Sequence, residues 1–281
     1  MRLVSIDHGG RPACGVVQGD HVLVAPASPW ADLRAVLEAG ALADFARACE
    51  ASGGRVPLAE AALLPVIPNP GKILCIGLNY EEHRRETGRA EAAHPTIFTR
   101  FADSQAAHGQ PLLRPRVSTD FDYEGELAVV IGKAGRHIPR DRAMEHVAGY
   151  SCYDDGSVRD WQRHTHQFTP GKNFPQTGGF GPWLVTADEV PDLGALQLTT
   201  RVNGAVVQQT GLDHMIFDVP RLIEYCSAFT PLSPGDVIAT GTPGGVGAKR
   251  QPPLWLKPGD VVEVEITGIG VLRNGIADEP G

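Results

Sequence analysis

The sequence lacks the features that would place a protein in a membrane or on nucleic acid. No apolar run approaches the ~20 residues of a membrane-spanning helix, and the polar N-terminal stretch does not resemble a signal peptide. The formal net charge is −8 and no cluster of lysine and arginine stands out, which disfavours binding to nucleic acid or to an anionic membrane. We therefore expect a soluble, cytoplasmic protein that binds neither nucleic acid nor membranes.

Paired cysteines and several catalytic sequence motifs are also missing. The five cysteines are scattered and form no Cys-x-x-Cys motif, as is typical of reduced, buried thiols in a reducing compartment. Neither a Gly-x-Ser-x-Gly elbow nor a P-loop nor a Gly-x-Gly-x-x-Gly segment after a strand occurs. A serine hydrolase of the nucleophile-elbow type is therefore not expected.

Glycine and proline are abundant and divide the chain into two predicted domains. The 281 residues include 33 glycines, 23 prolines and only 6% aromatic residues, a composition typical of a turn-rich fold with short strands. Residues 14–17 and 21–24 predict a β-hairpin, and residues 30–50 predict a helical stretch. The proline-rich residues 64–71 predict a boundary, giving a small α+β N-terminal domain at 1–65 and a larger second domain at 66–281.

Residues 66–281 predict a mainly β fold with some α-helix. Apolar runs at 72–76, 127–131 and 147–153 have strand character, and residues 81–88 form either a short polar helix or a mobile loop. A Leu-x-Pro-Gly-Asp-Val segment occurs at 232–237 and again at 256–261. Each Pro-Gly-Asp predicts a turn, and the β-branched residues after it predict a strand.

Two glutamates are spaced so that their side chains share one face of a strand. Glu124 and Glu126 flank a glycine directly before the apolar run at 127–131, and residues i and i+2 of a strand lie roughly 7 Å apart on one side. Two negative charges at about that distance repel by roughly 2 kcal/mol at an effective dielectric constant of about 20. Either a hard divalent cation between them or a solvated edge strand would relieve that repulsion, and the spacing alone fits both.

Further acidic residues and two histidines bear on the metal hypothesis. Asp154 and Asp155 follow the run at 147–153 and are the candidates for a third carboxylate ligand. His164 and His166 also alternate, but a zinc site would need more histidine or cysteine at matching spacing. We interpret the two histidines as surface residues or as residues that contact the metal ligands rather than the ion.

Two other segments place polar groups where they could act on a ligand. His83 and Glu86 are three residues apart, so a helical turn would put the imidazole beside a carboxylate that orients it. The same spacing also fits a solvated ion pair. The glycine-rich residues 241–247 can cradle an anion with their backbone N–H groups.

Seven segments of the second domain occur in the order typical of one enzyme family. They are Gly77-Leu78-Asn79-Tyr80-x-x-His83, Asp122-Tyr123-Glu124-x-Glu126-Leu127, Asp155-x-Ser157-x-Arg159-Asp160-x-Gln162, Gly171-Lys172-x-Phe174, Gly181-Pro182-Trp183, Met215-Ile216-Phe217 and Pro234-Gly235-Asp236-Val237-Ile238-x-Thr240-Gly241-Thr242-Pro243. Together they resemble the fumarylacetoacetate hydrolase family over residues 70–276 or so.

The resemblance implies the fold and the metal site of that family. The second domain would be a mixed β-sandwich or β-roll catalytic domain, and the protein would be a homodimer. The resemblance also implies that Mg²⁺ or Mn²⁺ is held by Glu124, Glu126 and Asp155.

The resemblance further implies roles for residues around the ion. His83 and Glu86 match the general-base pair of the family, and Lys172 matches its catalytic lysine. The positions that hold substrate oxygens are matched by Arg159, Gln162 and Thr242.

The activity implied by the resemblance concerns small oxo-acids. It indicates a hydrolase that cleaves a carbon–carbon bond of a 2,4-dioxo acid, of the acylpyruvate or fumarylpyruvate type, through an enolate that the metal stabilises. An isomerase of hydroxymuconate or hydroxyheptadienedioate type, or an oxaloacetate decarboxylase, would use the same cage because these reactions pass through a similar enolate. The residues leave these alternatives open.

The chain departs from the family pattern at several positions. Other residue types are usual at Gly125, Gly156, Asn173, His214 and residues 177–179. Because the last of these are small and close in sequence to Lys172, they predict a pocket of altered shape and hence an altered substrate.

Overall fold

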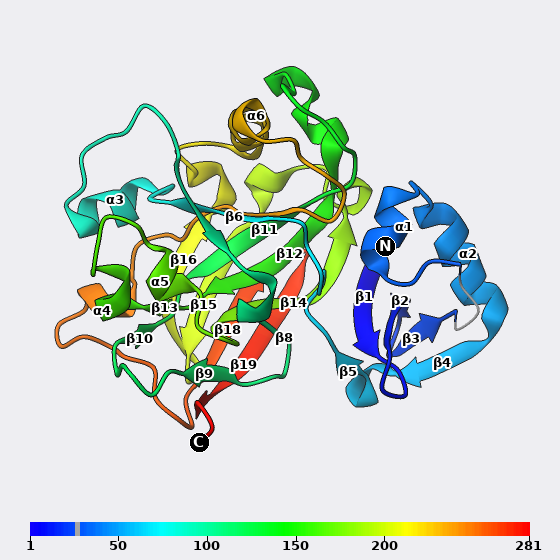
Figure 1. The fold of residues 1–281 in the computed structure, drawn as a ribbon, viewed down its shortest axis with the longest axis horizontal. Coiled ribbons are helices and arrows are strands. Elements are labelled where there is room, and N and C mark those ends of the chain that lie inside the picture. The colour runs from blue at the N-terminus through cyan, green and yellow to red at the C-terminus, as the bar shows by residue number, and fades with distance from the viewer. Residues whose placement is uncertain (26–28) are drawn as a thin grey trace.

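The computed structural model describes residues 1–25 and 29–281 and consists mostly of strands. Within these residues the strands form one sheet of twelve, one of five and one of two. Figure 1 shows the sheets stacked in the middle of the larger part of the molecule, with short helices around them. The mainly β fold with some α-helix is therefore confirmed.

The N-terminal segment contributes one end of the twelve-stranded sheet. Its strands β1 (Arg2–Asp7), β2 (Pro12–Gln18), β3 (His21–Val24) and β4 (Gly54–Pro57) pair antiparallel in that order, and β5 (Ala62–Leu63) pairs with β1. The helical stretch predicted for 30–50 is two helices, α1 (Leu33–Glu38) and α2 (Leu42–Ser52). The chain turns between them at Gly40, whose φ of 61° suits glycine.

The N-terminal strands continue the sheet of the second region. Strand β1 pairs with β14 (Gly178–Thr186), with Arg2 opposite Val185. The N-terminal helices and strands still form a distinct lobe on one side in Figure 1. Residues 64–72 contain no helix or strand, so the connection lies where the boundary was predicted, and the division into 1–65 and 66–281 stays a prediction.

The rest of the twelve-stranded sheet carries the strands that lead into the candidate site. Beyond β14 the order is β12 (Val147–Asp155), β11 (Gly125–Ile131), β17 (Val237–Ala239), β6 (Ile73–Gly77) and β7 (Thr96–Arg100), while β8 (Gln105–Ala107) pairs parallel to β14. The three expected strand runs are thus confirmed as parts of β6, β11 and β12.

Two smaller sheets complete the β structure. The five-stranded sheet has the order β16 (Ala205–Gly211), β15 (Gln197–Val202), β18 (Val261–Ile266), β19 (Gly270–Asp278) and β9 (Leu112–Arg114). A two-stranded ladder joins β10 (Phe121–Asp122) and β13 (Ser157–Val158). The two Pro-Gly-Asp turns directly precede β17 and β18, as predicted.

The helices of the second region are short. They are α3 (Glu81–Thr87), α4 (Arg159–Gln162), α5 (Thr169–Lys172) and α6 (Val219–Phe229). The 3-10 turns span Leu58–Glu60, Ala102–Ser104, Arg140–His146, Ala187–Glu189, Leu193–Ala195, Leu212–His214 and Gly247–Lys249. Residues 81–88 are therefore a helix followed by its C-cap glycine, the first of the two predicted alternatives.

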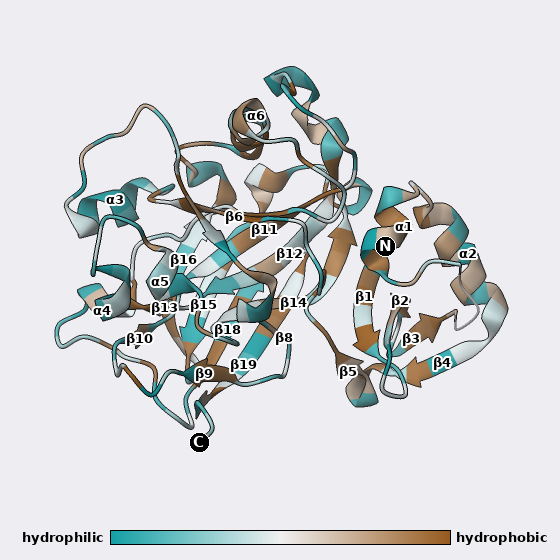
Figure 2. Cartoon of the chain, viewed as in Figure 1, coloured by the Kyte–Doolittle hydropathy of each residue, from teal (hydrophilic) through white to brown (hydrophobic). Residues whose placement is uncertain are grey.

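Strand β11 is buried on both faces, which explains its continuous apolar run. Leu127 and Val129 belong to a core shared with the five-stranded sheet and α6, whereas Ala128 and Val130 belong to a core shared with the N-terminal lobe. Figure 2 shows β11 as largely hydrophobic and α3 as largely hydrophilic. The two glutamates before and within this strand therefore enter the most buried part of the protein.

Among the residues that the structure describes, no helix has both the length and the apolar character needed to cross a bilayer.

A buried asparagine ties the start of α3 to the sheet. The Asn79 side chain is fully buried; its Nδ2 donates to Thr240 O at 2.7 Å and to Phe217 O at 3.0 Å, while its Oδ1 accepts from Phe217 N at 2.8 Å. These bonds join the chain after β6 to the chain after β17. Asn79 thereby fixes the start of α3 and, through it, the position of His83.

Replacing this asparagine should therefore be costly. We expect Asn79→Ala to lower the free energy of unfolding by about 2–3 kcal/mol, because it leaves buried backbone groups of Thr240 and Phe217 without partners. Chemical denaturation measures the difference. Asn69→Ala, which removes an exposed bond to Asp32, is the control and should change stability by less than about 0.5 kcal/mol; equal effects of the two variants would contradict this role.

Candidate active site

Three buried carboxylates converge where β11 begins and β12 ends. Glu124, Glu126 and Asp155 each offer an oxygen, and these oxygens all lie within 4.8 Å of one another. The backbone brings them together because Asp155 N donates to Glu124 O at 2.8 Å. The three side chains are 5%, 1% and 0% exposed, which excludes the solvated edge strand as an explanation of the Glu124 and Glu126 spacing. Of the two aspartate candidates, Asp155 joins the cluster.

The local backbone differs from the continuous strand that the sequence predicts. Asp122 lies in β10, and β11 starts only at Gly125, so Glu124 sits in the step between two sheets. Glycine is required at this step, because a Cβ on Gly125 would overlap with Thr200 Oγ1. The carboxylates of Glu124 and Glu126 nevertheless lie in the same cluster.

Three cations neutralise two of the carboxylates. Lys172 Nζ lies 2.7 Å from Glu124 Oε2 and 2.7 Å from Asp155 Oδ2. Arg100 Nη1 lies 2.6 Å from Asp155 Oδ1, and Arg159 Nη1 lies 2.6 Å from Glu124 Oε1. Glu126 differs, because its Oε2 accepts a hydrogen bond from Gly241 N at 2.9 Å and no lysine or arginine of the described residues pairs with it.

The pKa values follow this uneven distribution of charge. Burial acts to raise the pKa of Glu124, but Arg159 and Lys172 outweigh it and lower that pKa to about 2. For Glu126, burial and the nearby charges of Asp155 and Glu124 together raise the pKa well above its usual range. Burial acts to lower the pKa of Lys172, but the charges of Asp155 and Glu124 outweigh it and raise that pKa above its usual value. This side chain is therefore an ammonium.

The donor set fits a hard divalent cation. It consists only of carboxylate oxygens, which Mg²⁺ and Mn²⁺ prefer, and Glu126 is a buried acid without a cationic partner among the described residues. A divalent ion would supply the positive charge that Glu126 lacks. Glu124, Glu126 and Asp155 are therefore the residues that would hold it.

Arg100 is a part of this site that sequence reasoning missed. Its side chain is 2% exposed and, besides Asp155, it donates to Gly156 O at 3.0 Å and Thr177 Oγ1 at 2.7 Å. A Cβ on Gly178 would lie 2.7 Å from Arg100 Nη2, so the small residue makes room for the guanidinium. The only signal in the sequence is an arginine at the end of an apolar strand.

The positions that depart from the family pattern lie outside the cavity wall. Gly178 accommodates Arg100, and Asn173 Nδ2 donates to Thr99 O and Thr169 O. A Cβ on Gly156 would overlap with Thr177 O. None of the departing positions lines the cavity described below, and an altered pocket shape stays a prediction.

Asp122 connects the glycine-rich loop to the site and was also missed as a functional group. Its carboxylate accepts from Gly247 N at 2.8 Å, from Ala248 N at 2.9 Å and from Arg159 Nε at 2.8 Å. Elsewhere in the loop, Gly241 N donates to Glu126 and Gly245 N donates to a glutamate of α3. The backbone donors of residues 241–247 thus bind carboxylates of the protein itself.

His83 and Glu86 form a partly buried pair on α3. His83 Nδ1 and Glu86 Oε2 are 3.2 Å apart, and Glu86 Oε1 accepts from Gly245 N at 3.1 Å. His83 is only 6% exposed, so the alternative of a solvated ion pair does not hold. The carboxylate is fixed by the loop, and it in turn orients the imidazole, whose other nitrogen remains for a ligand.

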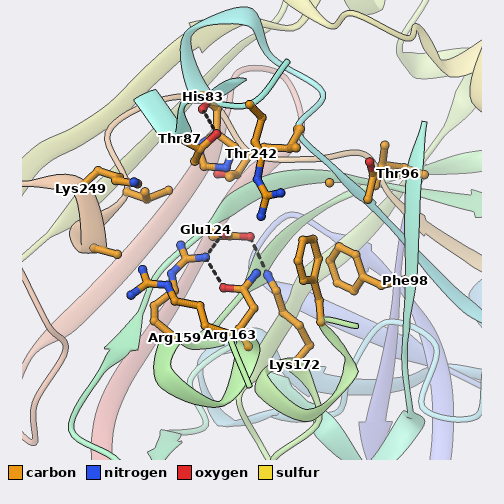
Figure 3. Close-up of a pocket in the computed structure, with 18 of the residues that line it drawn as sticks. His83, Thr87, Thr96, Phe98, Glu124, Arg159, Arg163, Lys172, Thr242 and Lys249 are labelled. Atoms are coloured by element: carbon orange, nitrogen blue, oxygen red, sulfur yellow. Dashed lines mark hydrogen bonds and ion pairs between the residues drawn. The ribbon is translucent and has the colours of Figure 1, made fainter. Parts of the chain in front are cut away.

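These groups face one cavity of about 800 Å³. In Figure 3, Glu124 lies near its centre, with Lys172 and Arg159 on either side and His83 beyond Thr242. Glu126 and Gln162 also line it. The structure therefore places His83, Lys172 and two of the three predicted metal ligands, Glu124 and Glu126, on the wall of a single cavity. Asp155 and Glu86 lie behind that wall, in contact with residues that line it.

The predicted substrate-binding residues differ in which polar atoms remain available. Arg159 Nη2 has no hydrogen-bond partner among the described residues although it is buried, and Gln162 accepts from Arg159 through Oε1 only. The Thr242 hydroxyl donates to Gly125 O at 3.0 Å and accepts from Gln208 at 2.8 Å. Arg159 and Gln162 thus retain N–H groups for a ligand, whereas the Thr242 hydroxyl proton is already used.

His164 and His166 are exposed and lie on the wall of the same cavity. This agrees with their interpretation as surface residues. They are separated from the carboxylates, and the group that could hold an ion does not include them.

Comparison with known proteins identifies the family. A model described as "Fumarylacetoacetate (FAA) hydrolase C-terminal" matches residues 72–277, and one described as "Rv2993c-like, N-terminal" matches residues 1–65. This chain belongs to the fumarylacetoacetate hydrolase family.

Similar proteins carry different activities in their names. An oxaloacetate tautomerase from Xenopus laevis, described as mitochondrial, is 44% identical over 217 residues, which are 76% of this chain and 68% of that protein. The structure of a fumarylacetoacetate hydrolase from Exiguobacterium antarcticum is 34% identical with a TM-score of 0.88, covering 99% of this chain and 100% of that chain. A maleylpyruvate hydrolase from Sphingobium sp. SYK-6, solved with manganese(II) and pyruvate, is 28% identical with a TM-score of 0.83 and full coverage of both chains.

The metal assignment can be tested without measuring turnover. We expect Glu126→Gln to weaken Mn²⁺ binding by about 100-fold or more, while the metal-free variant is at least as stable as the wild type because a like charge has been removed. Calorimetric titration with Mn²⁺ and thermal unfolding measure the two effects. Glu82→Gln on the exposed face of α3 is the control, and unchanged Mn²⁺ affinity in Glu126→Gln would refute the assignment.

Proposed function

We propose that this chain is an enzyme that moves a proton at the carbon beside the 2-oxo group of a small 2-oxo acid, interconverting its keto and enol forms. The observation that carries the proposal is one cavity lined by a buried imidazole with an orienting carboxylate, an ammonium, and two members of a three-carboxylate cluster. The similarity to an oxaloacetate tautomerase supports this choice. We also propose that the ion is Mg²⁺ or Mn²⁺, that the protein is a homodimer and that it is cytoplasmic.

The acid end of the substrate would lie at the floor of the cavity. Arg159 Nη2 and Gln162 have N–H groups available for its oxygens. A divalent ion bound by the three carboxylates supplies positive charge that makes a C–H bond beside the 2-oxo group more acidic. The Lys172 ammonium adds a second fixed positive charge at this place, which favours the anionic form of the substrate.

His83 is the group that would accept the proton. Its Nδ1 is held by Glu86, so Nε2 is the nitrogen that can take a proton from a bound substrate and return it. Protonated imidazole is stabilised by the Glu86 carboxylate. Because Glu86 is in turn held by Gly245 N, the base keeps one orientation through both transfers.

Hydrolysis of a carbon–carbon bond in a 2,4-dioxo acid is the second candidate. The size of the cavity favours it, because about 800 Å³ exceeds what a four-carbon acid needs and leaves room for an acyl group and a water. His83 would then take its proton from water rather than from carbon. Similarity to two hydrolases supports this candidate as well.

Isotope exchange tests the shared step. We expect Mn²⁺-loaded protein to exchange the C3 protons of a 2-oxo acid for deuterium, and His83→Gln to slow this exchange by about 100-fold or more while binding Mn²⁺ normally. Proton NMR in deuterium oxide measures the rate. His21→Gln, an N-terminal histidine outside the cavity, is the control; wild-type exchange by His83→Gln would exclude His83 as the base.

A mass measurement then separates the two candidates. An acylpyruvate incubated with the loaded enzyme keeps its mass if the protein is a tautomerase and yields two acids if it is a hydrolase. Both outcomes are compatible with exchange that depends on His83.

A further inference from the structure

A glutamine of the five-stranded sheet reaches the carboxylate cluster. Gln208 lies in β16 and its side chain is 2% exposed, whereas the next residue, Gln209, is exposed. A buried amide is unfavourable unless its polar atoms are hydrogen-bonded. The partners of Gln208 therefore indicate its role, and they lie on the step into β11 and on the glycine-rich loop.

The Gln208 amide joins these two segments. Its Oε1 accepts from Gly125 N at 3.0 Å, and its Nε2 donates to Thr242 Oγ1 at 2.8 Å and to Pro243 O at 3.0 Å. Because a backbone N–H can only donate and a carbonyl oxygen can only accept, these partners fix the orientation of the amide. Both N–H groups and the carbonyl oxygen of the side chain are used.

The Thr242 hydroxyl closes a ring of hydrogen bonds around Gly125. It accepts from the glutamine amide and donates to Gly125 O at 3.0 Å, so the N–H and the C=O of this glycine both belong to the ring. Gly125 is the residue between Glu124 and Glu126. Gly241, next to Thr242, donates its N–H to Glu126 Oε2 at 2.9 Å. The ring thus holds the backbone between the two glutamates and, through the loop, one of their carboxylates.

Close packing supports the ring on both sides. A Cβ on Gly125 would overlap with Thr200 Oγ1 of β15, and a Cβ on Gly245 would overlap with Val207 O of β16. The step into β11 and the glycine-rich loop therefore both lie directly against the five-stranded sheet. Gln208 is the side chain that bonds to both of them.

We propose that Gln208 is a positioning residue for the metal site, which keeps Glu124 and Glu126 at the separation that a divalent ion requires. The inference rests on the divalent ion of the proposed function. Without the ring, the peptide at Gly125 can rotate and the repelling carboxylates can move apart, so that only a fraction of the molecules is ready to bind the ion. Gln208 itself does not line the cavity and acts through the two ligands.

Mn²⁺ binding by the whole chain tests this role. Gln208→Met roughly keeps the volume of the side chain but removes the amide. We expect it to weaken Mn²⁺ binding by about 10-fold, as is typical for the loss of a group that orients a metal ligand. Calorimetric titration measures the affinity, and thermal unfolding shows whether the variant is folded.

Two matched controls separate positioning from a loss of stability. Gln209→Met makes the same change at the adjacent, exposed residue. Asn274→Leu removes another buried amide, which donates to Ala107 O and Gln110 O outside the cavity. Both controls should bind Mn²⁺ within about twofold of the wild type, because distant sites are energetically independent. A loss in Asn274→Leu equal to that in Gln208→Met would overturn the positioning role.

A double-variant cycle tests whether the ring is the cause. Thr242→Val removes the other side chain of the ring and should weaken Mn²⁺ binding as Gln208→Met does. The double variant should be within about twofold of either single variant, because both changes break the same ring; additive losses would contradict it. Thr242→Ser keeps the hydroxyl and should restore the affinity. If Gln208→Met does not fold, equal Mn²⁺ affinities of Thr242→Val and Thr242→Ser would overturn the ring.

The failures of this inference and of the proposed function are distinguishable. Wild-type Mn²⁺ affinity in Gln208→Met would overturn the positioning role and leave the exchange reaction at His83 untouched. If the loaded wild type exchanges no C3 proton, the proposed function fails while the effect of Gln208 on Mn²⁺ binding stands. Failure of the wild type to bind Mn²⁺ would overturn the metal assignment, and the positioning role with it.

Discussion

The site depends on holding three carboxylates close together in the interior of the protein. Their ligand oxygens lie within 4.8 Å of one another, and two negative charges at that distance repel by about 3.5 kcal/mol at an effective dielectric constant of about 20. Lys172, Arg100 and Arg159 offset this repulsion for Glu124 and Asp155. Glu126 is left with one backbone donor. The need for a further positive charge is thus localised at one side chain, and it faces the cavity.

The fold supplies the positions of these charges from separate strands of the twelve-stranded sheet and from the step that leads into it. Glu124 lies in the step from β10 to β11, Asp155 ends β12, and Arg100 ends β7. Buried polar groups fix the loops between them: Asp122 binds Arg159 and the glycine-rich loop, and Asn79, just before α3, binds Thr240 after β17. Because buried polar groups are costly when unpaired, these hydrogen bonds favour one arrangement of the loops around the site.

Sequence reasoning reached the groups that local spacing or a family pattern marks. Glu124 and Glu126 stand out because two acids precede a buried strand, and the Pro-Gly-Asp turns before β17 and β18 have their own turn chemistry. Arg100 could not be found in this way, since its partners Asp155 and Thr177 are distant in sequence. The step at Gly125 was missed because it depends on close packing against Thr200, which the periodicity of apolar residues does not report. The break at Gly40 was missed although its signal is local, a glycine at positive φ directly after α1.

The buried and the exposed cations that line the cavity differ in what their replacement would cost. Removal of Arg159 or Lys172 would take one of two cations from the buried Glu124 carboxylate, and breaking a buried ion pair typically costs about 3–5 kcal/mol. Arg89, Arg163 and Lys249 compensate no buried charge, so their replacement leaves the cluster intact. The cations that hold the carboxylate cluster are therefore tied to stability, whereas Arg89, Arg163 and Lys249 can be replaced without disturbing the cluster. The similar proteins are named as a tautomerase and as hydrolases, so activity differs among them although they share a fold, as expected when function resides in the site rather than in the fold.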